Sequence, residues 1–528
     1  MKDVIVVGSG IGGLCTAVRL LKKGFKVTIL EKEGTVGGKI NIKENEQFKF
    51  DLTASILMTP HMYTEVFDYS GRDYRDYFKL INLEPIYNVN FYDGSRFYTY
   101  KDADKMKEEL DNLEKRDDIS EDNNELMDYK YCENKKSEIS DKKYESNSRL
   151  FNEYLDFMKK TMKKYYIADT MLINKPMIDV KEMLSAETVK SISKIKPLKS
   201  SHKYISKLID NEKFSDYLIF LTMYMGINPY EVSNIYTMIP AISHSYGIGY
   251  IKGGFYNYIL ALVKLIYEMG GKIETNTEVQ QIIVKNDRVS AVKTDKIIYK
   301  SDIVVCNADY PYAVKNLFHK NVEAELRSER HMIKKEASCS IFMIYLGLSR
   351  KFDELSVHNI YISRNFRESI EKPFKGDIPD NPSIYIYYPS AVDDTLCTRG
   401  KSVMNLMVRV PNLSFKNIQW NEEKIHEFRK KIINEIKNIK GLENIEKYIE
   451  YEDYLIPDDL QGRFNSYEGS AFGLSHKLSQ SLILRPAMKE KNLKGLYFIG
   501  SSTHPGNGVS IIIEGTKVLA EIIQNDYL

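Results

Sequence analysis

The first thirty residues consist of two apolar segments separated by a glycine-rich turn and a helix-like repeat. Residues 4–7 form a short apolar run, the turn GSGIGG follows, and apolar positions then recur at helical spacing until Gly24. The segment KVTILEK adds a second apolar strand directly after that helix. A strand, a turn, a helix and a strand in this order predict a βαβ unit, whose crossover makes the two strands parallel.

A highly charged segment interrupts the pattern in the first third of the chain. Mixed charges are dense from residue 101, and residues 113–150 hold little apolar material, so we expect a charged surface insertion there. Helical spacing returns with FNEYLDFMKKTMKKYY and continues through an aromatic-rich region to about residue 242. The segment DYLIFLTMYMGINPY in that region suits either a packed core or the lining of an apolar tunnel.

The second half of the chain combines strand-type alternation with further helices. Residues 255–269 predict a helix that ends at a Gly-Gly pair, and residues 303–306 predict a buried strand. The segments SIFMIYLGL, SIYIYYPSA and SVMNLMVRV alternate with the period of strands and predict an antiparallel sheet. The amphipathic segment KIHEFRKKIINEIKNI suits either packing on that sheet or contact with a bilayer.

Composition narrows the class of protein. A chain of 528 residues predicts two domains, and a net charge of +2 gives no reason to expect a nucleic-acid partner. The five cysteines are scattered without the spacing of a metal site, so we expect no bound metal. No apolar run reaches the roughly 18–20 residues of a spanning helix, and the first residues resemble a strand rather than a signal peptide. We therefore expect a cytoplasmic protein.

The first turn carries the spacing GxGxxG at Gly8, Gly10 and Gly13. The first glycine permits a tight turn, the second lets the backbone approach a pyrophosphate, and the third lets the helix pack closely on the strand. Glu31 ends the next strand 18 residues after Gly13, where an acid can bind a ribose 2′-hydroxyl. The glycine pair at residues 37–38 suits an extended cofactor, and Glu31 would repel the 2′-phosphate of NADP, so the pattern predicts FAD.

A second glycine-rich turn lies near residue 500. The strand YFI runs into GSSTHPGNG, and an apolar helix begins after Gly508. In a fold whose first strand and helix hold a pyrophosphate, this turn can lie beside them, and the N–H groups of its helix can point at the flavin ring or the ribityl chain. A plain connection between strand and helix is the alternative.

These motifs together resemble the bacterial-type phytoene desaturases, a family of FAD-dependent carotenoid desaturases and isomerases. The similarity covers nearly the whole chain apart from the charged segment. It rests on VIVVGSGIGGLCTAVRL, EKEGTVGGK, FDYSGRDYRDYFKL, YIKGGFYNYILALV, CNADYPY and SCSIFMIYLGL, and most specifically on SAFGLSHKLSQSLILRP and GLYFIGSSTHPGNGV. Two places depart from the family pattern, the segment Asp51–Ser55 and Ser510, which stands where a proline is common.

The resemblance implies an α/β fold, with a Rossmann-like FAD-binding domain on a parallel sheet and a second substrate domain of antiparallel sheet plus helices. The FAD-binding domain would comprise residues 1–90, 246–310 and 471–528, and the substrate domain residues 91–245 and 311–470. The implied FAD contacts are Gly8, Ser9, Gly10, Ile11, Gly12, Gly13, Glu31, Lys32, Gly38, Lys39, Val279, Gly500, Ser501, Gly508 and Val509. Val279 would hold the adenine through its backbone.

The implied reaction is the desaturation of phytoene or diapophytoene. The flavin takes a hydride and the neighbouring carbon loses a proton, so the protein mainly supplies orientation and a dry channel. His504 is the first candidate for proton handling and His476 the second, while His244 and His358 are weaker candidates. Cys306 and Cys339 lie in apolar strands and are more typical of a core.

Other functions fit the same motifs. A flavin enzyme of this fold could isomerise, saturate or terminally oxidise a carotenoid or retinoid, or oxidise another lipid, and a carrier of lipids or prenyl groups would need no redox turnover. The expected partners are an apolar polyene, the inner surface of the cell membrane, and oxygen or a quinone as the electron acceptor.

Overall fold

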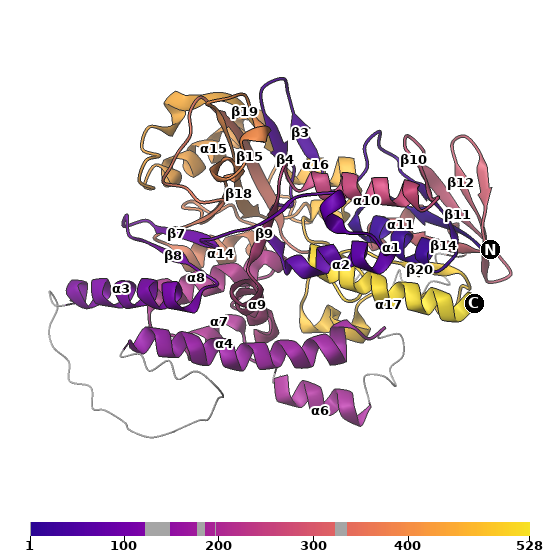
Figure 1. Cartoon of the computed structure of the whole chain (residues 1–528), viewed down its shortest axis with the longest axis horizontal. Coiled ribbons are helices and arrows are strands. Elements are labelled where there is room, and N and C mark those ends of the chain that lie inside the picture. The colour runs from indigo at the N-terminus through magenta and orange to yellow at the C-terminus, as the bar shows by residue number, and fades with distance from the viewer. Residues whose placement is uncertain (1, 122–147, 177–184, 196, 321, 323–334) are drawn as a thin grey trace.

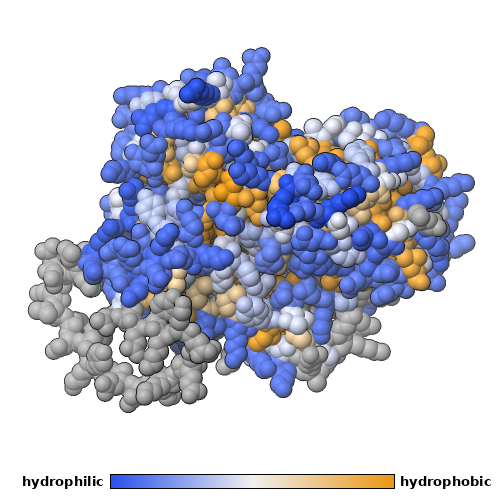
Figure 2. Space-filling view, in the orientation of Figure 1, coloured by the Kyte–Doolittle hydropathy of each residue, from blue (hydrophilic) through white to orange (hydrophobic). Residues whose placement is uncertain are grey.

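The computed structural model describes residues 2–121, 148–176, 185–195, 197–320, 322 and 335–528. Two large sheets organise these residues, a parallel one near both termini and an antiparallel one at the opposite end of the molecule (Figure 1). The predicted charged insertion falls mainly on residues 122–147, which lie outside the described residues. Within the described ranges, no helix is both long enough and apolar enough to cross a membrane. The face seen in Figure 2 is largely hydrophilic, with hydrophobic areas interspersed.

The predicted βαβ unit forms the centre of a five-stranded parallel sheet. Its strands, in spatial order, are β10 (Lys272–Glu274), β2 (Lys26–Leu30), β1 (Asp3–Val7), β14 (Ile303–Cys306) and β20 (Leu496–Phe498). Successive residues of a strand face opposite sides of the sheet. Val4 and Val6 therefore share a core with α1 (Ile11–Lys22), α10 (Tyr256–Glu268) and α17 (Val509–Tyr527). Ile5 and Val7 pack instead toward β11 (Val279–Lys285), β12 (Arg288–Thr294) and β13 (Ile298–Lys300).

The predicted antiparallel sheet has seven strands. In spatial order they are β19 (Ile449–Leu455), β15 (Ser340–Leu348), β18 (Ser402–Val410), β17 (Ile384–Tyr387), β16 (His358–Ile362), β7 (Tyr87–Phe91) and β8 (Arg96–Thr99). Six neighbouring strand pairs give five antiparallel ladders and one parallel ladder, between β16 and β7. The mixed α/β fold with a parallel and an antiparallel sheet is thus confirmed, and the domain boundaries stay predictions.

Helices cover both faces of the antiparallel sheet. On one face, Phe428 and Ile432 of α15 (Glu422–Ile436) pack against strand residues such as Phe342 and Leu406. This is the amphipathic segment of the sequence, and its apolar side is buried on the protein's own sheet. The other face packs toward α4 (Arg149–Ala168) and α8 (Glu212–Thr222), which bury most of the aromatic segment as core.

Three small sheets and the remaining helices complete the described part of the fold. The small sheets are β11 with β12 and β13, β3 (Ile42–Glu44) with β4 (Lys49–Asp51), and β5 (Leu57–Met58) with β9 (Ile248–Ile251) and β6 (Leu80–Asn82). The further helices are α2 (Pro60–Ser70), α3 (Ala103–Glu121), α6 (Ala186–Ile195), α7 (Ser201–Ile205), α9 (Met238–Tyr246), α11 (Tyr310–Asn316), α14 (Phe366–Lys375) and α16 (Pro457–Phe464).

Candidate functional site

A cavity of about 360 Å³ lies between the two large sheets. It begins at residues that follow the parallel strands, including Gly8 after β1, Glu31 after β2, Asn307 after β14 and Gly500 after β20. It ends at side chains of the antiparallel sheet such as Ile341. The crevice at the carboxyl ends of parallel strands is the general ligand site of open α/β sheets, so this cavity is the candidate site.

The first glycine turn is held to Glu31. The backbone N–H and the hydroxyl of Ser9 both donate to Glu31 Oε2, at 2.8 and 2.6 Å, and the N–H of Glu33 donates to Oε1 at 3.0 Å. Gly8 adopts a φ of 94°, a conformation that a side chain would strain. These bonds fix the carboxylate of Glu31 beside the turn, at the wall of the cavity.

Asn307 packs against the start of α1 and explains two of the glycines. Its Nδ2 donates to the carbonyl of Ile499 at 2.8 Å. A Cβ on Gly10 would lie 2.6 Å from Asn307 Oδ1, and one on Gly12 would lie 2.7 Å from Nδ2. Helix α1 has no side-chain cap and no acidic residue in its first turn. Its free N–H groups and partial positive charge therefore suit an anionic group such as a phosphate.

Arg485 forms hydrogen bonds with the backbone of the second glycine turn. This buried guanidinium donates to the carbonyls of Ser501 at 2.5 Å and of Leu474, Ser475 and Thr503 at 3.1 Å each. Helix α17 follows the turn, and its N-terminus likewise has no side-chain cap and no acid in the first turn. Because Arg485 holds the carbonyls of Ser501 and Thr503, the backbone of the second glycine turn has a fixed position at the cavity.

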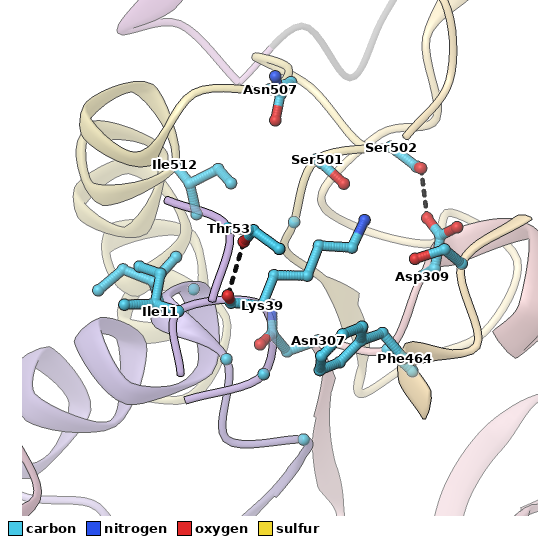
Figure 3. A pocket seen from close by; sticks show the side chains of 18 of the residues that line it. Ile11, Lys39, Thr53, Asn307, Asp309, Phe464, Ser501, Ser502, Asn507 and Ile512 are labelled. Carbon is cyan, nitrogen blue, oxygen red and sulfur yellow. Dashed lines mark hydrogen bonds between the residues drawn. The ribbon is translucent and has the colours of Figure 1, made fainter. Parts of the chain in front are cut away.

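Two charged residues, Lys39 and Asp309, lie near the second glycine turn. Figure 3 shows Lys39 extending toward Ser501, with Asp309 to its right and Ser502 above Asp309. Lys39 Nζ donates to the carbonyls of Ser470 at 3.2 Å and Ala471 at 3.1 Å. Burial lowers the pKa of Lys39, and the nearby Asp309 opposes that shift. Asp309 accepts hydrogen bonds from the Ser502 hydroxyl and, at 2.8 Å, from the N–H of Tyr467.

Asp51, directly before the residues that depart from the family pattern, forms hydrogen bonds with elements from two parts of the molecule. Its carboxylate accepts the N–H of Phe255 at 2.8 Å and the hydroxyl of Tyr387 at 2.9 Å. Its own carbonyl accepts Asn405 Nδ2 at 2.7 Å. Burial raises the pKa of Asp51, whereas these hydrogen bonds lower it. The segment is thus tied both to the start of α10 and to the antiparallel sheet.

The far wall of the cavity is largely apolar. Ile341 of β15, Met407 of β18 and Phe472 line it together with Ile56 and Met58. Tyr224 and Arg409 also line this part of the cavity. The cavity therefore passes from polar glycine turns at one end to hydrophobic side chains at the other.

Comparisons with known proteins agree with this arrangement. The sequence profile described as flavin containing amine oxidoreductase matches residues 11–512. The chain belongs to this family. It is 32% identical over 99% of both chains to the 4,4'-diapophytoene desaturase (4,4'-diaponeurosporene-forming) of Staphylococcus haemolyticus, and 30% identical over 99% of both chains to that of Staphylococcus aureus strain Newman. The resemblance to the carotenoid desaturases is thereby confirmed.

Solved structures share the fold at low sequence identity. An oxidoreductase from Methanosarcina mazei gives a TM-score of 0.62 at 16% identity, covering 98% of this chain and all of the other. A triple mutant of putrescine oxidase gives a TM-score of 0.60 at 12% identity, covering 99% of both chains. The family membership confirms the predicted cofactor, so this chain is an FAD-dependent oxidoreductase of the flavin containing amine oxidoreductase family.

The residues present fit that flavin cofactor. Two helices begin at the cavity without side-chain caps, and glycines stand where a Cβ would collide with Asn307. Most of the residues expected to contact FAD line the cavity, namely Gly8, Gly10, Ile11, Gly12, Glu31, Lys32, Gly38, Lys39, Val279, Gly500, Ser501, Gly508 and Val509. Ser9 and Gly13 do not. Ser9 bonds to Glu31 behind the turn, and a Cβ on Gly13 would lie 2.3 Å from the Gly8 carbonyl.

The two leading histidine candidates do not line the cavity. His504 is buried, and its Nε2 lies 3.0 Å from the Lys175 carbonyl. His476 is also buried, and its Nε2 accepts the N–H of Asn507 at 3.1 Å. Burial, with the charge of Arg485, holds the pKa of His476 well below its usual range. The geometry therefore gives neither ring direct access to a ligand in the cavity.

The two weaker histidine candidates, His244 and His358, belong to the core. His244 lies between the hydroxyls of Tyr154 at 3.1 Å and Tyr217 at 2.7 Å, and His358 Nδ1 lies 2.7 Å from the Tyr385 hydroxyl. Burial lowers the pKa of both histidines to about 3. Cys306 and Cys339 are buried as expected, and burial raises the pKa of each thiol to about 12.

Sequence reasoning missed Asn307, Asp309 and Arg409 as lining residues, whereas Tyr224 stands in the aromatic segment for which a tunnel lining was one of two predictions. Asn307 and Asp309 stand in CNADYPY, a motif that carries the family resemblance, so that motif held a usable signal. Arg409 stands in SVMNLMVRV, where strand alternation predicts which residues share a face but not which face meets the cavity.

Proposed function

We propose that this protein is an FAD-dependent desaturase that introduces double bonds into diapophytoene. The observation that carries the proposal is full-length similarity to two 4,4'-diapophytoene desaturases, with 99% of each chain aligned. The apolar wall formed by Ile341, Met407 and Phe472 supports it, because a hydrocarbon can bind only through apolar contacts and exclusion of water.

The proposal assigns the glycine turns to the cofactor. The uncapped N–H groups at the start of α1 would hold the pyrophosphate, and Glu31 would bind the adenosine ribose. Val279 would meet the adenine, and Gly500, Ser501, Gly508 and Val509 would line the ribityl and ring end. When bound, FAD supplies the acceptor of a hydride from the substrate. The protein's own contribution is to bind, orient and keep water away.

Several contacts support that contribution. Arg485 fixes the carbonyls of the second turn, and Lys39 is fixed by the Ser470 and Ala471 carbonyls. Asp51 ties the segment that includes Thr53, Ala54 and Ser55, all of which line the cavity, to two neighbouring elements. A fixed wall holds the reacting carbon in one position, and positioning of this kind contributes substantially to catalysis.

We further propose that the enzyme works at the inner surface of the cell membrane and passes electrons to oxygen or a quinone. The support is chemical. An apolar polyene is concentrated in the bilayer, and a reduced flavin must be reoxidised before the next turnover. Sedimentation of the enzyme with lipid vesicles tests the first statement, and reoxidation rates with oxygen and with a soluble quinone test the second.

Co-expression tests the proposed activity. The chain is expressed in cells that make diapophytoene and, separately, in cells that make phytoene, and the extracted pigments are scanned for absorbance. We expect coloured extracts from the diapophytoene cells. A Glu31→Ala variant should give less pigment because Glu31 would no longer hold the ribose or the Ser9 turn. Colourless extracts from both backgrounds, with folded and flavin-loaded protein, would refute the proposal.

A further inference from the structure

Arg409 places a charged side chain on the apolar wall of the cavity. It belongs to β18, where Met404, Leu406 and Val408 face the core beneath α15. Met407 and Arg409 occupy the alternate positions and line the cavity. Across the ladder Arg409 pairs with Ile341 of β15, which is also a lining residue. The guanidinium therefore lies on the same face as the hydrophobic part of the site.

Arg409 lacks the partners that the other buried arginines have. Among the described residues three arginines are buried, with exposed fractions of 1% for Arg19, 4% for Arg409 and 3% for Arg485. Arg19 donates to Thr516 at 2.9 Å and to Glu65 at 2.6 Å, and Arg485 donates to the carbonyls of the second turn. Among the residues that the structure describes, the Nε and Nη2 atoms of Arg409 have no hydrogen-bond partner.

The surroundings of Arg409 do not compensate its charge. The Phe220 ring lies 5.2 Å from the guanidinium carbon, which gives a cation–π contact but no hydrogen-bond acceptor. The titratable groups that act on Arg409 are Cys339, Tyr224 and Tyr385, and no carboxylate is among them. Burial accordingly lowers the pKa of Arg409. A buried cation with two nitrogens that lack hydrogen bonds and with no counter-ion among these groups is costly, so an outside partner would stabilise it.

We propose that this wall is a subsite for an apolar, chain-like ligand that ends in an oxygen acceptor, a carboxylate or a carbonyl, held by the Arg409 guanidinium. The inference goes beyond the proposed function, because diapophytoene is a hydrocarbon and the ligand proposed for the same cavity carries a polar end group. A pure hydrocarbon offers nothing to an unpaired guanidinium. A terminal carboxylate matches the planar fork with two hydrogen bonds, and a carbonyl accepts at least one. The apolar chain of the ligand lies against Ile341, Met407 and Phe472.

Equilibrium dialysis of the FAD-loaded protein tests the subsite without requiring turnover. The probes are all-trans-retinoate, all-trans-retinal and squalene, which share an apolar polyprenoid chain and differ in their end group. The proteins are the wild type, Arg409→Met, Arg409→Lys and the matched control Met407→Leu, which alters the same face without removing a charge.

Loss of the guanidinium should be selective for the oxygenated probes. We expect Arg409→Met to bind retinoate about ten- to a hundredfold more weakly than the wild type, because a hydrogen bond to a charged group is lost. Retinal should lose less affinity, and squalene should change by less than about threefold. Arg409→Lys should recover part of the retinoate affinity. Met407→Leu should change the affinity for all three probes by the same factor relative to the wild type.

Three outcomes would overturn the inference. The first is equal retinoate affinity in the wild type and in Arg409→Met. The second is an equal loss for retinoate and squalene, which would mean that Arg409 only shapes the wall. The third is loss of FAD from Arg409→Met with unchanged probe binding per flavin, which would assign the guanidinium to the cofactor. Pigment formation is measured separately, so failure of the subsite leaves desaturation standing, and absence of pigment counts against the proposed function instead.

Discussion

Adding one methyl group at Gly12 tests the role assigned to the first turn. Gly12 lies in the first turn of α1, where an Ala side chain is sterically normal for a helix. The obstacle is tertiary. The new Cβ would lie 2.7 Å from Asn307 Nδ2, 3.1 Å from Ile499 Cγ1 and 3.2 Å from Ile512 Cγ2. These neighbours belong to the segments after β14 and β20 and to α17. A shift of α1 away from one of them would therefore bring the new Cβ closer to another.

The cost of Gly12→Ala follows from what must move. Asn307 can retreat only by weakening its 2.8 Å hydrogen bond to the Ile499 carbonyl, which costs about 1 kcal/mol net and more if the carbonyl is left unpaired. Crowding of the two isoleucines adds an overpacking cost, typically about 1–3 kcal/mol. We therefore expect the free energy of unfolding to fall by about 2–4 kcal/mol. Displacement of the helix start should weaken FAD binding by about tenfold or more, since tenfold is about 1.4 kcal/mol.

Gly462→Ala is the matched control for this variant. Gly462 also lies within a helix, α16, but a Cβ there would meet no atom within 4 Å. Alanine should stabilise that helix by about 0.5–1 kcal/mol and leave FAD binding unchanged. Urea denaturation and flavin absorbance after dialysis measure both quantities. Equal stability and equal FAD retention in Gly12→Ala and Gly462→Ala would refute the assignment of the first turn.

Three further substitutions test other parts of the account. Arg485→Met should lower the free energy of unfolding by about 3–5 kcal/mol, because it leaves the buried carbonyls of the second turn without their donor; a loss below about 1 kcal/mol in urea denaturation would show that the turn holds itself. Burial, with the charge of Glu212, raises the pKa of Asp216 to about 7, so the folded protein keeps a proton that the unfolded chain releases. The contribution of Asp216 to the free energy of unfolding should therefore fall as pH rises from about 4 to 7, so the free energy of unfolding of the wild type minus that of Asp216→Asn should fall over this range; a difference that does not change with pH would contradict the shifted pKa. His504→Gln should retain pigment formation within about threefold, because His504 does not line the cavity, whereas a loss of about a hundredfold would restore it as the proton carrier.

The part of the fold that holds the first glycine turn could be predicted from the sequence, because the residues that indicate it are close together in the chain. The turn with Gly8, Gly10 and Gly13 lies between a strand and a helix that are adjacent in the chain, and Glu31 follows on the next strand. The antiparallel sheet was predicted from the alternation of three segments, yet its strands β7 and β8 come from residues 87–99, far earlier in the chain. Pairing between distant segments leaves no local trace, so β16 lying parallel to β7 could not be foreseen.

The sequence pattern did not predict the orientation of His504, the first candidate for proton handling. His504 stands in the turn that lines the cavity, one residue after Thr503, which does line it. Which way each residue of an irregular turn points depends on contacts from elsewhere, here on Arg485 and on the Lys175 carbonyl. The same holds for Arg409, whose orientation is decided by which face of β18 is covered by α15.

Anaerobic mixing of the FAD-loaded protein with diapophytoene in lipid vesicles tests the central claim most directly. The account predicts that the flavin absorbance bleaches in proportion to the substrate added while the absorbance bands of a longer conjugated polyene appear. A flavin that stays oxidised with an unchanged substrate would contradict desaturation. A change in polyene geometry without bleaching would assign isomerisation instead.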